Sequence, residues 1–424
     1  MKQELEFQRI LKTKIENLLK VIGCVVIEGP KQSGKTFLGE KLSQSIFYMQ
    51  EKGLANEIIL DVPYAENPIF NGPKPKLIDE WQIVPRIWDK VRFLIDQAKG
   101  TNGLFILTGS SKPDYQKIFH NGAGRMAIVN LQTLTFAEII HDQQKVSLSS
   151  LFEQVKLDPI TTNYQIEWVA QQLLKGGWPH ILQNPVTGHH LLDDYLQIWM
   201  QNNFLPSSNL RFNQTIMKKV FHSLSRLNGT QLKKTTVLSD LKQTINIKTL
   251  NRYLDYIDAQ YLTFNLNIWN PDWNHRSKKQ LQTSPKVYLC DPAIGLRILK
   301  LKTTEELFLD LNTFGIYFEN QVIKDLLVYA QTINAEAFFY RDTNGLEIDA
   351  ILELDDGNWA AIEIKLGAIQ IEQAAKNLLH FNKQMEQFKS KRRQAKFLMI
   401  ITAGESAYQR ADGIYVVPHV CLEP

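Results

Sequence analysis

The chain has 424 residues, of which 44% are hydrophobic and 22% are charged, so it is long enough to bury several cores in about three domains. A net charge of +4 permits nucleic-acid binding without requiring it. The three cysteines, Cys24, Cys290 and Cys421, lie too far apart in the sequence for a ligand cluster and favour a reducing compartment. The charged N-terminus and the lack of a long apolar run predict a cytoplasmic protein with no membrane span.

The first predicted elements surround a glycine-rich loop. Residues 4–21 have the periodicity of an amphipathic helix, residues 24–27 form an apolar strand, and residues 36–48 are expected to be helical. Between strand and second helix lies G-x-x-x-x-G-K-T, the pattern of a phosphate-binding loop in its proper context. The residues predicted to bind the nucleotide here are Gly29, Pro30, Lys31, Gln32, Ser33, Gly34, Lys35 and Thr36.

Each fixed position of the loop has a chemical reason. The two glycines let backbone N–H groups turn toward phosphate oxygens, and the helix N-terminus adds partial positive charge. Lys35 is expected to reach the β- and γ-phosphates of ATP, and Thr36 to offer its hydroxyl to Mg²⁺. A glycine-rich turn with a chance lysine is the structural alternative.

Three further strands are predicted, at residues 57–61, 76–80 and 103–107. The second ends in Asp79 and Glu80, which suit a Mg²⁺ ligand and a base that activates the attacking water. The third is followed by Thr108, which could sense the γ-phosphate or simply form a turn. Strands alternating with helices predict an α/β fold with a parallel sheet. The loop and the Asp79–Glu80 pair predict ATP and Mg²⁺ as cofactors.

These motifs occur in one order and resemble the predicted prokaryotic AAA+ ATPases that carry a C-terminal domain of unknown function. The matching segments, which span nearly the whole chain, are residues 29–36, 77–85, 107–110, 124–125, 134–138, 176–179 and 284–288. The resemblance leaves Arg125 either structural, which we favour, or in contact with a neighbour's nucleotide. Where the family often has an Arg-Asp pair, this chain has Asn202-Asn203, which leaves open the source of any trans-acting arginine.

The middle of the chain resembles a winged helix-turn-helix. Helices are predicted at residues 216–227, 235–241 and 248–259, followed by a strand and by a wing at residues 270–283. The predicted nucleic-acid contacts are Lys248 and Arg252 on the third helix, with Asn251 beside them, and Lys278 and Lys279 in the wing, near Arg276. The alternative is a unit that only connects domains or contacts proteins.

The last third contains a second group of polar residues. Residues 346–354 alternate between apolar and acidic side chains, and residues 359–365 return as a second strand, so Asp349, Glu363 and Lys365 are expected on one face. A helix over residues 314–330 brings Glu319 nearby. Two carboxylates and a lysine suit metal-assisted phosphodiester hydrolysis, although a solvated hairpin face has similar residues.

The D…E-x-K order resembles the PD-(D/E)xK nuclease superfamily. The resemblance implies that Asp349, Glu363 and Lys365 are catalytic, that Glu319, Asp349 and Glu363 hold Mg²⁺, and that Gln373 is the polar residue of the next helix. We therefore expect four units: an AAA+ domain (1–150), a helical lid (151–210), a winged helix (211–285) and a nuclease-like domain (286–424).

The expected function is ATP-driven action on branched or broken DNA by a homo-oligomer. Two rivals remain open. One is a DNA-binding ATPase whose nuclease fold does not cut, and the other is a nucleotide-switched signalling or defence protein with a protein partner.

Overall fold

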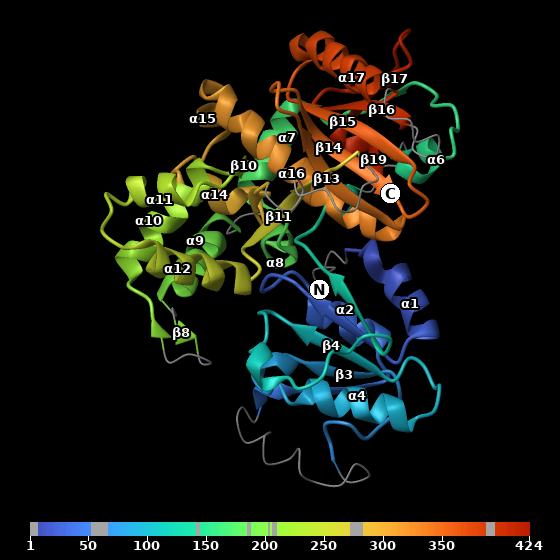
Figure 1. Cartoon of the computed structure of the whole chain (residues 1–424), viewed down its shortest axis with the longest axis vertical. Coiled ribbons are helices and arrows are strands. Elements are labelled where there is room, and N and C mark those ends of the chain that lie inside the picture. The colour runs from blue at the N-terminus through green and yellow to red at the C-terminus, as the bar shows by residue number, and fades with distance from the viewer. Residues whose placement is uncertain are drawn as a thin grey trace.

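The computed structural model describes residues 7–51, 67–140, 145–184, 188–201, 204–205, 210–271, 283–386 and 395–424. Figure 1 shows a smaller sheet formed by the N-terminal part, in blue and cyan, below a larger sheet formed mainly by the C-terminal part, in orange and red. The helices α10 (Gln214–Arg226), α11 (Lys234–Asp240) and α12 (Ile247–Ala259) lie to one side of both sheets.

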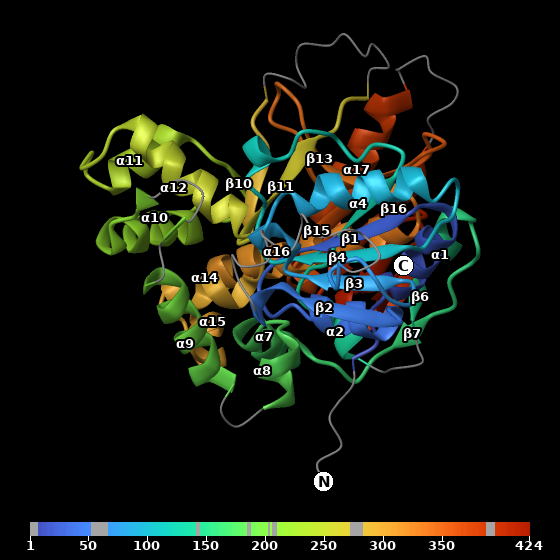
Figure 2. The ribbon, with the colours of Figure 1, turned by 90° about the horizontal axis from the view of Figure 1, so that it is seen from below.

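Within the described residues, the N-terminal sheet is parallel and has five strands in the order β2-β3-β4-β1-β5. The strands are β1 (Cys24–Glu28), β2 (Ser45–Tyr48), β3 (Lys76–Asp79), β4 (Phe105–Gly109) and β5 (Met126–Asn130). Val25 and Ile27 belong to the core beneath α1 (Leu11–Val21) and α2 (Lys35–Leu42), whereas Cys24 and Val26 pack with residues of α4 (Ile87–Gln97). Figure 2 shows these strands side by side between α2 and α4. The predicted α/β fold with a parallel sheet is confirmed.

Two predicted helices have different bounds. The helix expected over residues 36–48 ends at Leu42, and residues 45–48 form the edge strand β2 against β3. The Ser-Ile-Phe-Tyr sequence of β2 is rich in β-branched and aromatic residues. The preference of these residues for strands therefore prevailed over the helical spacing of the apolar residues. The helix expected over residues 4–21 begins at Leu11. The strand predicted at residues 57–61 lies outside the described residues.

The chain after β5 crosses to the C-terminal sheet before the helical region begins. After α5 (Phe136–Ile139), the short strand β6 (Val146–Ser147) pairs with β19 (Leu422–Glu423), and β7 (Ile160–Thr161) pairs with β17 (Ser406–Gln409). Helix α6 (Leu148–Phe152) lies between β6 and β7 in the chain. The helices predicted within residues 151–210 follow as α7 (Ile166–Lys175), α8 (Pro179–Gln183) and α9 (Gly188–Gln201), and the hairpin β8 (Phe204–Leu205) and β9 (Leu210–Arg211) closes this segment.

The three helices of the middle segment form close to their predicted positions, but their strands extend the large sheet. Strand β12 (Lys286–Leu289) pairs with β10 (Thr230–Gln231) and with β11 (Thr263–Ile268), and β11 pairs with β13 (Ala335–Arg341). The predicted boundary at 285/286 falls immediately before β12, which pairs with strands of the preceding unit. Residues 272–282 of the predicted wing lie outside the described part of the chain, so the winged-helix assignment stays a prediction.

The C-terminal sheet is built on a meander. Strands β13, β14 (Glu347–Leu354) and β15 (Trp359–Lys365) pair antiparallel, and β16 (Ala395–Thr402) and β18 (Tyr415–Pro418) continue the sheet in parallel. Helices α14 (Pro292–Ile298), α15 (Thr304–Leu309) and α16 (Leu311–Thr332) precede it, and α17 (Ile371–Glu386) connects β15 to β16. The apolar parts of α16 and α17 belong to separate core clusters, so the sheet is covered on both faces.

A bulge interrupts the alternation predicted for residues 346–354. The register between β13 and β14 shifts between Phe338 and Tyr340. As a result, Ile348 and Ile351 pack in the cluster with α17, while Ala350 and Leu352 join the cluster with α16. Two residues of one strand that are three apart therefore share a face, which a period of two cannot predict.

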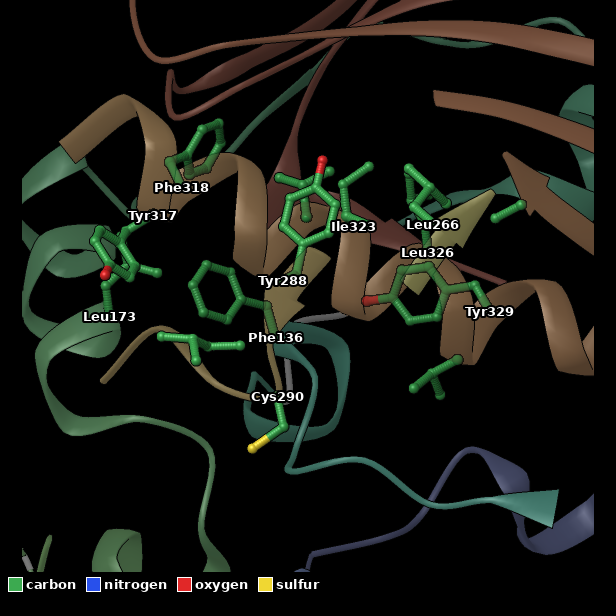
Figure 3. Packing of buried hydrophobic residues seen from close by; sticks show 14 of the residues in the cluster. Phe136, Leu173, Leu266, Tyr288, Cys290, Tyr317, Phe318, Ile323, Leu326 and Tyr329 are labelled. Carbon is green, nitrogen blue, oxygen red and sulfur yellow. The ribbon is translucent and has the colours of Figure 1, made fainter. Parts of the chain in front are cut away.

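Helix α16 joins the two sheets through a buried polar network. Lys324 Nζ donates to the Leu134 carbonyl at 2.8 Å, and Asp325 Oδ2 accepts from the Phe136 backbone N–H at 2.9 Å. Both side chains are fully buried. Figure 3 shows Phe136 together with Tyr317, Phe318 and other α16 residues in the shared core. Because buried charges are costly unless bonded, this contact fixes α16 against the segment that follows β5.

Candidate nucleotide site and carboxylate–lysine cluster

The glycine-rich loop has the backbone that its glycines permit. Gly29 has φ 151°, and a Cβ there would lie 2.0 Å from the Leu131 carbonyl oxygen, so no other residue fits. Gly34 has φ 93° and immediately precedes α2, which begins at Lys35. The N-terminus of α2 therefore starts at the loop, where unpaired backbone N–H groups favour an anion.

Two side chains from outside the motif hold the loop's carbonyls. Arg9 Nη1 donates to the Ser33 carbonyl at 2.5 Å, and Trp178 Nε1 donates to the Lys31 carbonyl at 3.2 Å. Arg9 also forms a buried ion pair with Glu138 at 2.9 Å. Because carbonyl oxygens would repel phosphate, fixing them away from the site leaves the loop's N–H groups to face it. The sequence placed Arg9 in a helix and gave no sign of this contact.

The residues predicted to bind Mg²⁺ meet at the carboxyl ends of β3 and β4. Asp79 Oδ1 accepts hydrogen bonds from Thr36 Oγ1 at 2.7 Å and from Thr108 Oγ1 at 2.6 Å. Burial raises the pKa of Asp79, and the two hydroxyls partly oppose this by bonding its carboxylate. Thr36 and Asp79 supply the oxygen ligands that Mg²⁺ prefers, and the Ser33 hydroxyl in the loop is buried without a partner among the described residues. The residues present therefore fit a Mg²⁺–nucleotide.

Glu80 is held beside this group by the residues around it. Its Oε2 accepts from Ser110 Oγ at 2.7 Å and from the side-chain amide of Gln82. The backbone N–H of Glu80 donates to Thr108 Oγ1 at 3.3 Å. Neither Gln82 nor Ser110 was predicted as a site residue, although both lie within segments that the family resemblance covers.

Lys35 is buried, and the nearby carboxylates of the site partly offset the cost of burying its charge. Its Nζ donates to the Pro30 carbonyl at 2.7 Å, and burial lowers its pKa to about 8, against which the charges of Glu80 and Asp79 act. A bound triphosphate would favour the charged lysine and raise this pKa again.

ATP binding is therefore expected to weaken as the pH rises above about 8. Below that pH the lysine is already protonated, whereas above it binding must take up a proton, so affinity should fall by up to about tenfold per pH unit. Isothermal titration calorimetry between pH 7 and 9.5, in buffers of different ionisation enthalpy, measures both the affinity and the proton uptake. Phosphate groups titrate near pH 6 and do not contribute in this window. A constant affinity with no proton uptake would contradict the assignment.

The segment after Ser110 bonds to the C-terminal end of α12. The Lys112 backbone N–H donates to the Ala259 carbonyl at 2.8 Å, and Lys112 Nζ pairs with Asp258 Oδ2 at 2.5 Å. Glu28, the last residue of β1, is buried, which raises its pKa, and interacts with Tyr261 and Lys112. The helix predicted to contact DNA is thus bonded to the strand ends of the nucleotide site.

The structure describes some, but not all, of the residues predicted to contact DNA or a neighbour's nucleotide. Lys248 and Arg252 are exposed on α12. Lys278 and Lys279 lie outside the described residues, as do Asn202 and Asn203. Arg125 pairs with Asp96 of its own domain at 2.9 Å, which agrees with a structural role.

In the C-terminal sheet, one lysine joins the two predicted carboxylates. Lys365 Nζ lies 2.9 Å from Asp349 Oδ2 and 2.5 Å from Glu363 Oε2. Asp349 Oδ2 also accepts from the Ile364 backbone N–H at 2.8 Å. The structure therefore brings Asp349, Glu363 and Lys365 together, as the sequence predicted. Gln373 donates to Asn377 on the exposed side of α17.

The two carboxylates have different protonation properties. Burial and the charge of Asp349 raise the pKa of Glu363 to about 8. Burial opposes ionisation of Asp349 too, but Lys365 and Lys286 hold its pKa below the usual value. Glu363 Oε1 is buried and has no hydrogen-bond partner in the described part of the chain. An unpartnered carboxylate oxygen beside a second carboxylate fits a divalent cation, which would complete its coordination with water.

Glu319 lies on the α16 side of this cluster. Its Oε1 accepts from Tyr288 OH at 2.6 Å and lies 3.4 Å from Lys286 Nζ, which also pairs with Glu347 at 2.6 Å. Across the described ranges, no three His, Cys, Asp or Glu side chains are gathered to bind one metal ion. The role of Glu319 as a metal ligand stays a prediction. Sequence reasoning missed Lys286, Tyr288 and Glu347, although residues 284–288 were part of the resemblance.

The comparisons with known proteins agree with the predicted N-terminal fold. Residues 23–140 match the model of the AAA domain family, residues 166–305 match a domain of unknown function (DUF8612), and residues 314–422 match another (DUF4143). The N-terminal part is therefore similar to AAA domains, and the C-terminal part is similar to DUF4143 domains. No helix among the described residues is long and apolar enough to span a membrane.

Relatives cover most of the chain at low identity. Uncharacterised proteins of Mycobacterium bovis and Mycobacterium tuberculosis are each 25% identical over 375 residues, which is 84% of this chain and 74% of theirs. Among solved structures, the Walker-type ATPase PABY2304 of Pyrococcus abyssi has a TM-score of 0.42 and 14% identity over 70% of this chain and 97% of its own. A RuvB variant of Thermotoga maritima has a TM-score of 0.26 and 13% identity over 60% and 88%, respectively.

Proposed function

We propose that the protein hydrolyses ATP and uses the reaction to act on DNA, with a metal-dependent nuclease-type site in its C-terminal domain. The observation that carries the ATPase proposal is the bonded group of Thr36, Asp79 and Thr108 directly beside Glu80. Mg²⁺ bound with the nucleotide supplies charge neutralisation at the phosphates.

The residues of the AAA domain divide the work of hydrolysis. The loop N–H groups and Lys35 bind the phosphates, and Thr36 and Asp79 hold the metal. Glu80 orients the attacking water and takes its proton, while Ser110 and Gln82 keep its carboxylate in place. Thr108 bonds both Asp79 and the Glu80 backbone, so it keeps the metal ligand and the base in register.

Two contact paths support coupling between nucleotide and the rest of the chain. Ser110, which bonds the base, lies two residues from Lys112, which bonds α12. Arg9, which bonds the loop, pairs with Glu138 of α5, and the first residue of α5 bonds Asp325 of α16. Movement of the loop or the base on hydrolysis would thus be passed to α12 and to α16, which carries Glu319.

DNA is the proposed partner because α12 presents Lys248 and Arg252 to solvent, with a helix-turn-helix arrangement behind them. Asn246 caps α12 by accepting from the Thr249 backbone N–H at 2.8 Å, so the first turn that carries Lys248 is well formed.

Replacing Lys248 and Arg252 together by Ala is expected to weaken DNA binding. If both contact phosphates, the slope of log affinity against log salt should become shallower by about two. Fluorescence anisotropy with labelled duplex at several salt concentrations measures this slope. The matched control is Lys376→Ala with Lys383→Ala, which removes the same charge from exposed positions on α17. An unchanged slope in the α12 variant would leave this unit as a connector.

The nuclease-type proposal rests on the cluster of Asp349, Glu363 and Lys365. A divalent ion held there, when bound, lowers the pKa of water and neutralises a phosphodiester. Asp349 and Glu363 would hold the ion, and Lys365 would position the water or stabilise the developing charge. The same cluster allows a second function, a DNA-binding platform without cleavage, because Lys365 already pairs with both carboxylates in the metal-free state.

A further inference from the structure

The carboxylate–lysine cluster receives side chains from a strand outside the meander. Strand β12 pairs with β10 and β11, and its residues Lys286 and Tyr288 both reach Glu319 of α16. Lys286 Nζ also pairs with Glu347 at 2.6 Å, and Glu347 lies two residues before Asp349 on β14. The cluster thus extends from β15 to β12, which pairs with strands of the middle segment.

These two side chains are buried, although each ends in a polar group. Tyr288 is fully buried and its ring stacks on Phe264 with centroids 5.4 Å apart. Lys286 is 7% exposed, whereas its partners Glu319 and Glu347 are 23% and 32% exposed. Figure 3 shows Tyr288 within the core, among α16 side chains that include Phe318 and Ile323. Burying a lysine and a tyrosine hydroxyl costs free energy unless both groups are bonded. Here the bonds to the Glu319 carboxylate offset that cost.

We propose that Tyr288 and Lys286 are positioning residues of the C-terminal site, which hold Glu319 for a divalent cation and its phosphodiester substrate. Both donate to Oε1 of Glu319, so the bonds to this carboxylate from the described residues use one of its two oxygens. Outer residues of this kind orient metal-binding carboxylates and set their affinity. This inference rests on the proposed metal-dependent function of the same site.

The arrangement also links the site to the middle segment, because β12 pairs with strands of that segment. Four carboxylates, Glu319, Glu347, Asp349 and Glu363, are joined by two lysines, each of which contacts two of them. Lys365 serves the pair on the meander, and Lys286 serves Glu319 and Glu347. Since β12 pairs with β11, which follows α12, the position of Glu319 depends on the unit that is proposed to contact DNA.

Tyr288→Phe tests the proposal without changing charge or ring packing. Mn²⁺ binding to the full-length, nucleotide-free protein is measured by calorimetry, and the binding that Asp349→Ala removes defines the C-terminal site. We expect Tyr288→Phe to weaken this binding by about tenfold. The matched control is Tyr317→Phe, which removes another buried tyrosine hydroxyl, one that bonds the Ser225 carbonyl at 2.9 Å and lies outside the cluster. It should leave Mn²⁺ affinity unchanged, and thermal unfolding of both variants records any loss of stability.

The outcomes separate this proposal from the proposed function. If wild type binds Mn²⁺ in an Asp349-dependent way and Tyr288→Phe binds it equally well, the positioning role is wrong while the metal site stands. Equal weakening in Tyr288→Phe and Tyr317→Phe would also overturn the role, because it would reflect general loosening of the core. If wild type shows no Asp349-dependent Mn²⁺ binding, the metal-dependent function fails and this inference fails with it.

Discussion

Glu80→Gln is expected to lower the rate of ATP hydrolysis by about 10²–10⁴-fold while leaving ATP affinity close to that of wild type. Glu80 is proposed to act on water, and its amide analogue keeps the shape and can still accept from Ser110 but cannot take a proton. Lys35→Ala should instead weaken ATP binding by on the order of 10–100-fold, since it removes a charge-assisted hydrogen bond to phosphate. Steady-state phosphate release and equilibrium binding of a fluorescent ATP analogue measure the two effects separately.

The control for both variants is Glu40→Gln on α2. Glu40 accepts a hydrogen bond from Tyr48 OH at 2.7 Å. Its replacement removes a carboxylate charge from the same domain. It should leave hydrolysis and binding near the wild-type values. Turnover by Glu80→Gln at the wild-type rate would show that another group activates the water.

The second large effect is expected in the C-terminal cluster. Asp349→Ala, Glu363→Ala and Lys365→Ala should each remove DNA cleavage in the presence of Mg²⁺ or Mn²⁺, because a site that cannot hold the metal has no activated water at neutral pH. ATP hydrolysis should persist, since its own metal is proposed to be held by Thr36 of α2 and Asp79 of β3, in the N-terminal domain. Gel assays on single-stranded, duplex and four-way DNA measure cleavage, with phosphate release measured in parallel.

Asp356→Asn serves as the matched control for cleavage. Asp356 lies in the exposed turn between β14 and β15, where it accepts from Asn358. Cleavage that persists in all three cluster variants would point to a contaminating nuclease. A wild type that binds DNA but cuts no form of it with metal supplied would favour the binding-platform alternative.

Local patterns located the loop and the strand end of the candidate nucleotide site, because both depend on local geometry. A glycine at position 29 and another at position 34 are needed by the loop itself, and Asp79 and Glu80 end a strand whose apolar residues are visible in the sequence. Arg9 and Trp178 could not be predicted in the same way. They reach the loop from 24 and 147 residues away, and nothing in the residues around them indicates that contact.

The C-terminal cluster shows a different limit. Asp349, Glu363 and Lys365 were found because they lie on neighbouring strands joined by one turn. The bulge opposite Phe339 changed which apolar residues of β14 face α17. A pattern of strict alternation cannot predict the extra residue of a bulge. Lys286 and Tyr288 were missed because the position of β12 beside Glu319 depends on long-range topology, which local patterns do not show.

The measurement that tests the central claim most directly is the ATPase rate with and without single-stranded, duplex and four-way DNA, for wild type and for the Lys248→Ala, Arg252→Ala double variant. ATP hydrolysis coupled to DNA through α12 predicts that at least one DNA form changes the wild-type rate, that added salt reduces the change, and that the double variant shows less of it with an unaltered basal rate. A basal rate that no DNA form changes, in a protein that shows no salt-sensitive DNA binding, would contradict the account and favour a nucleotide-switched protein with a protein partner.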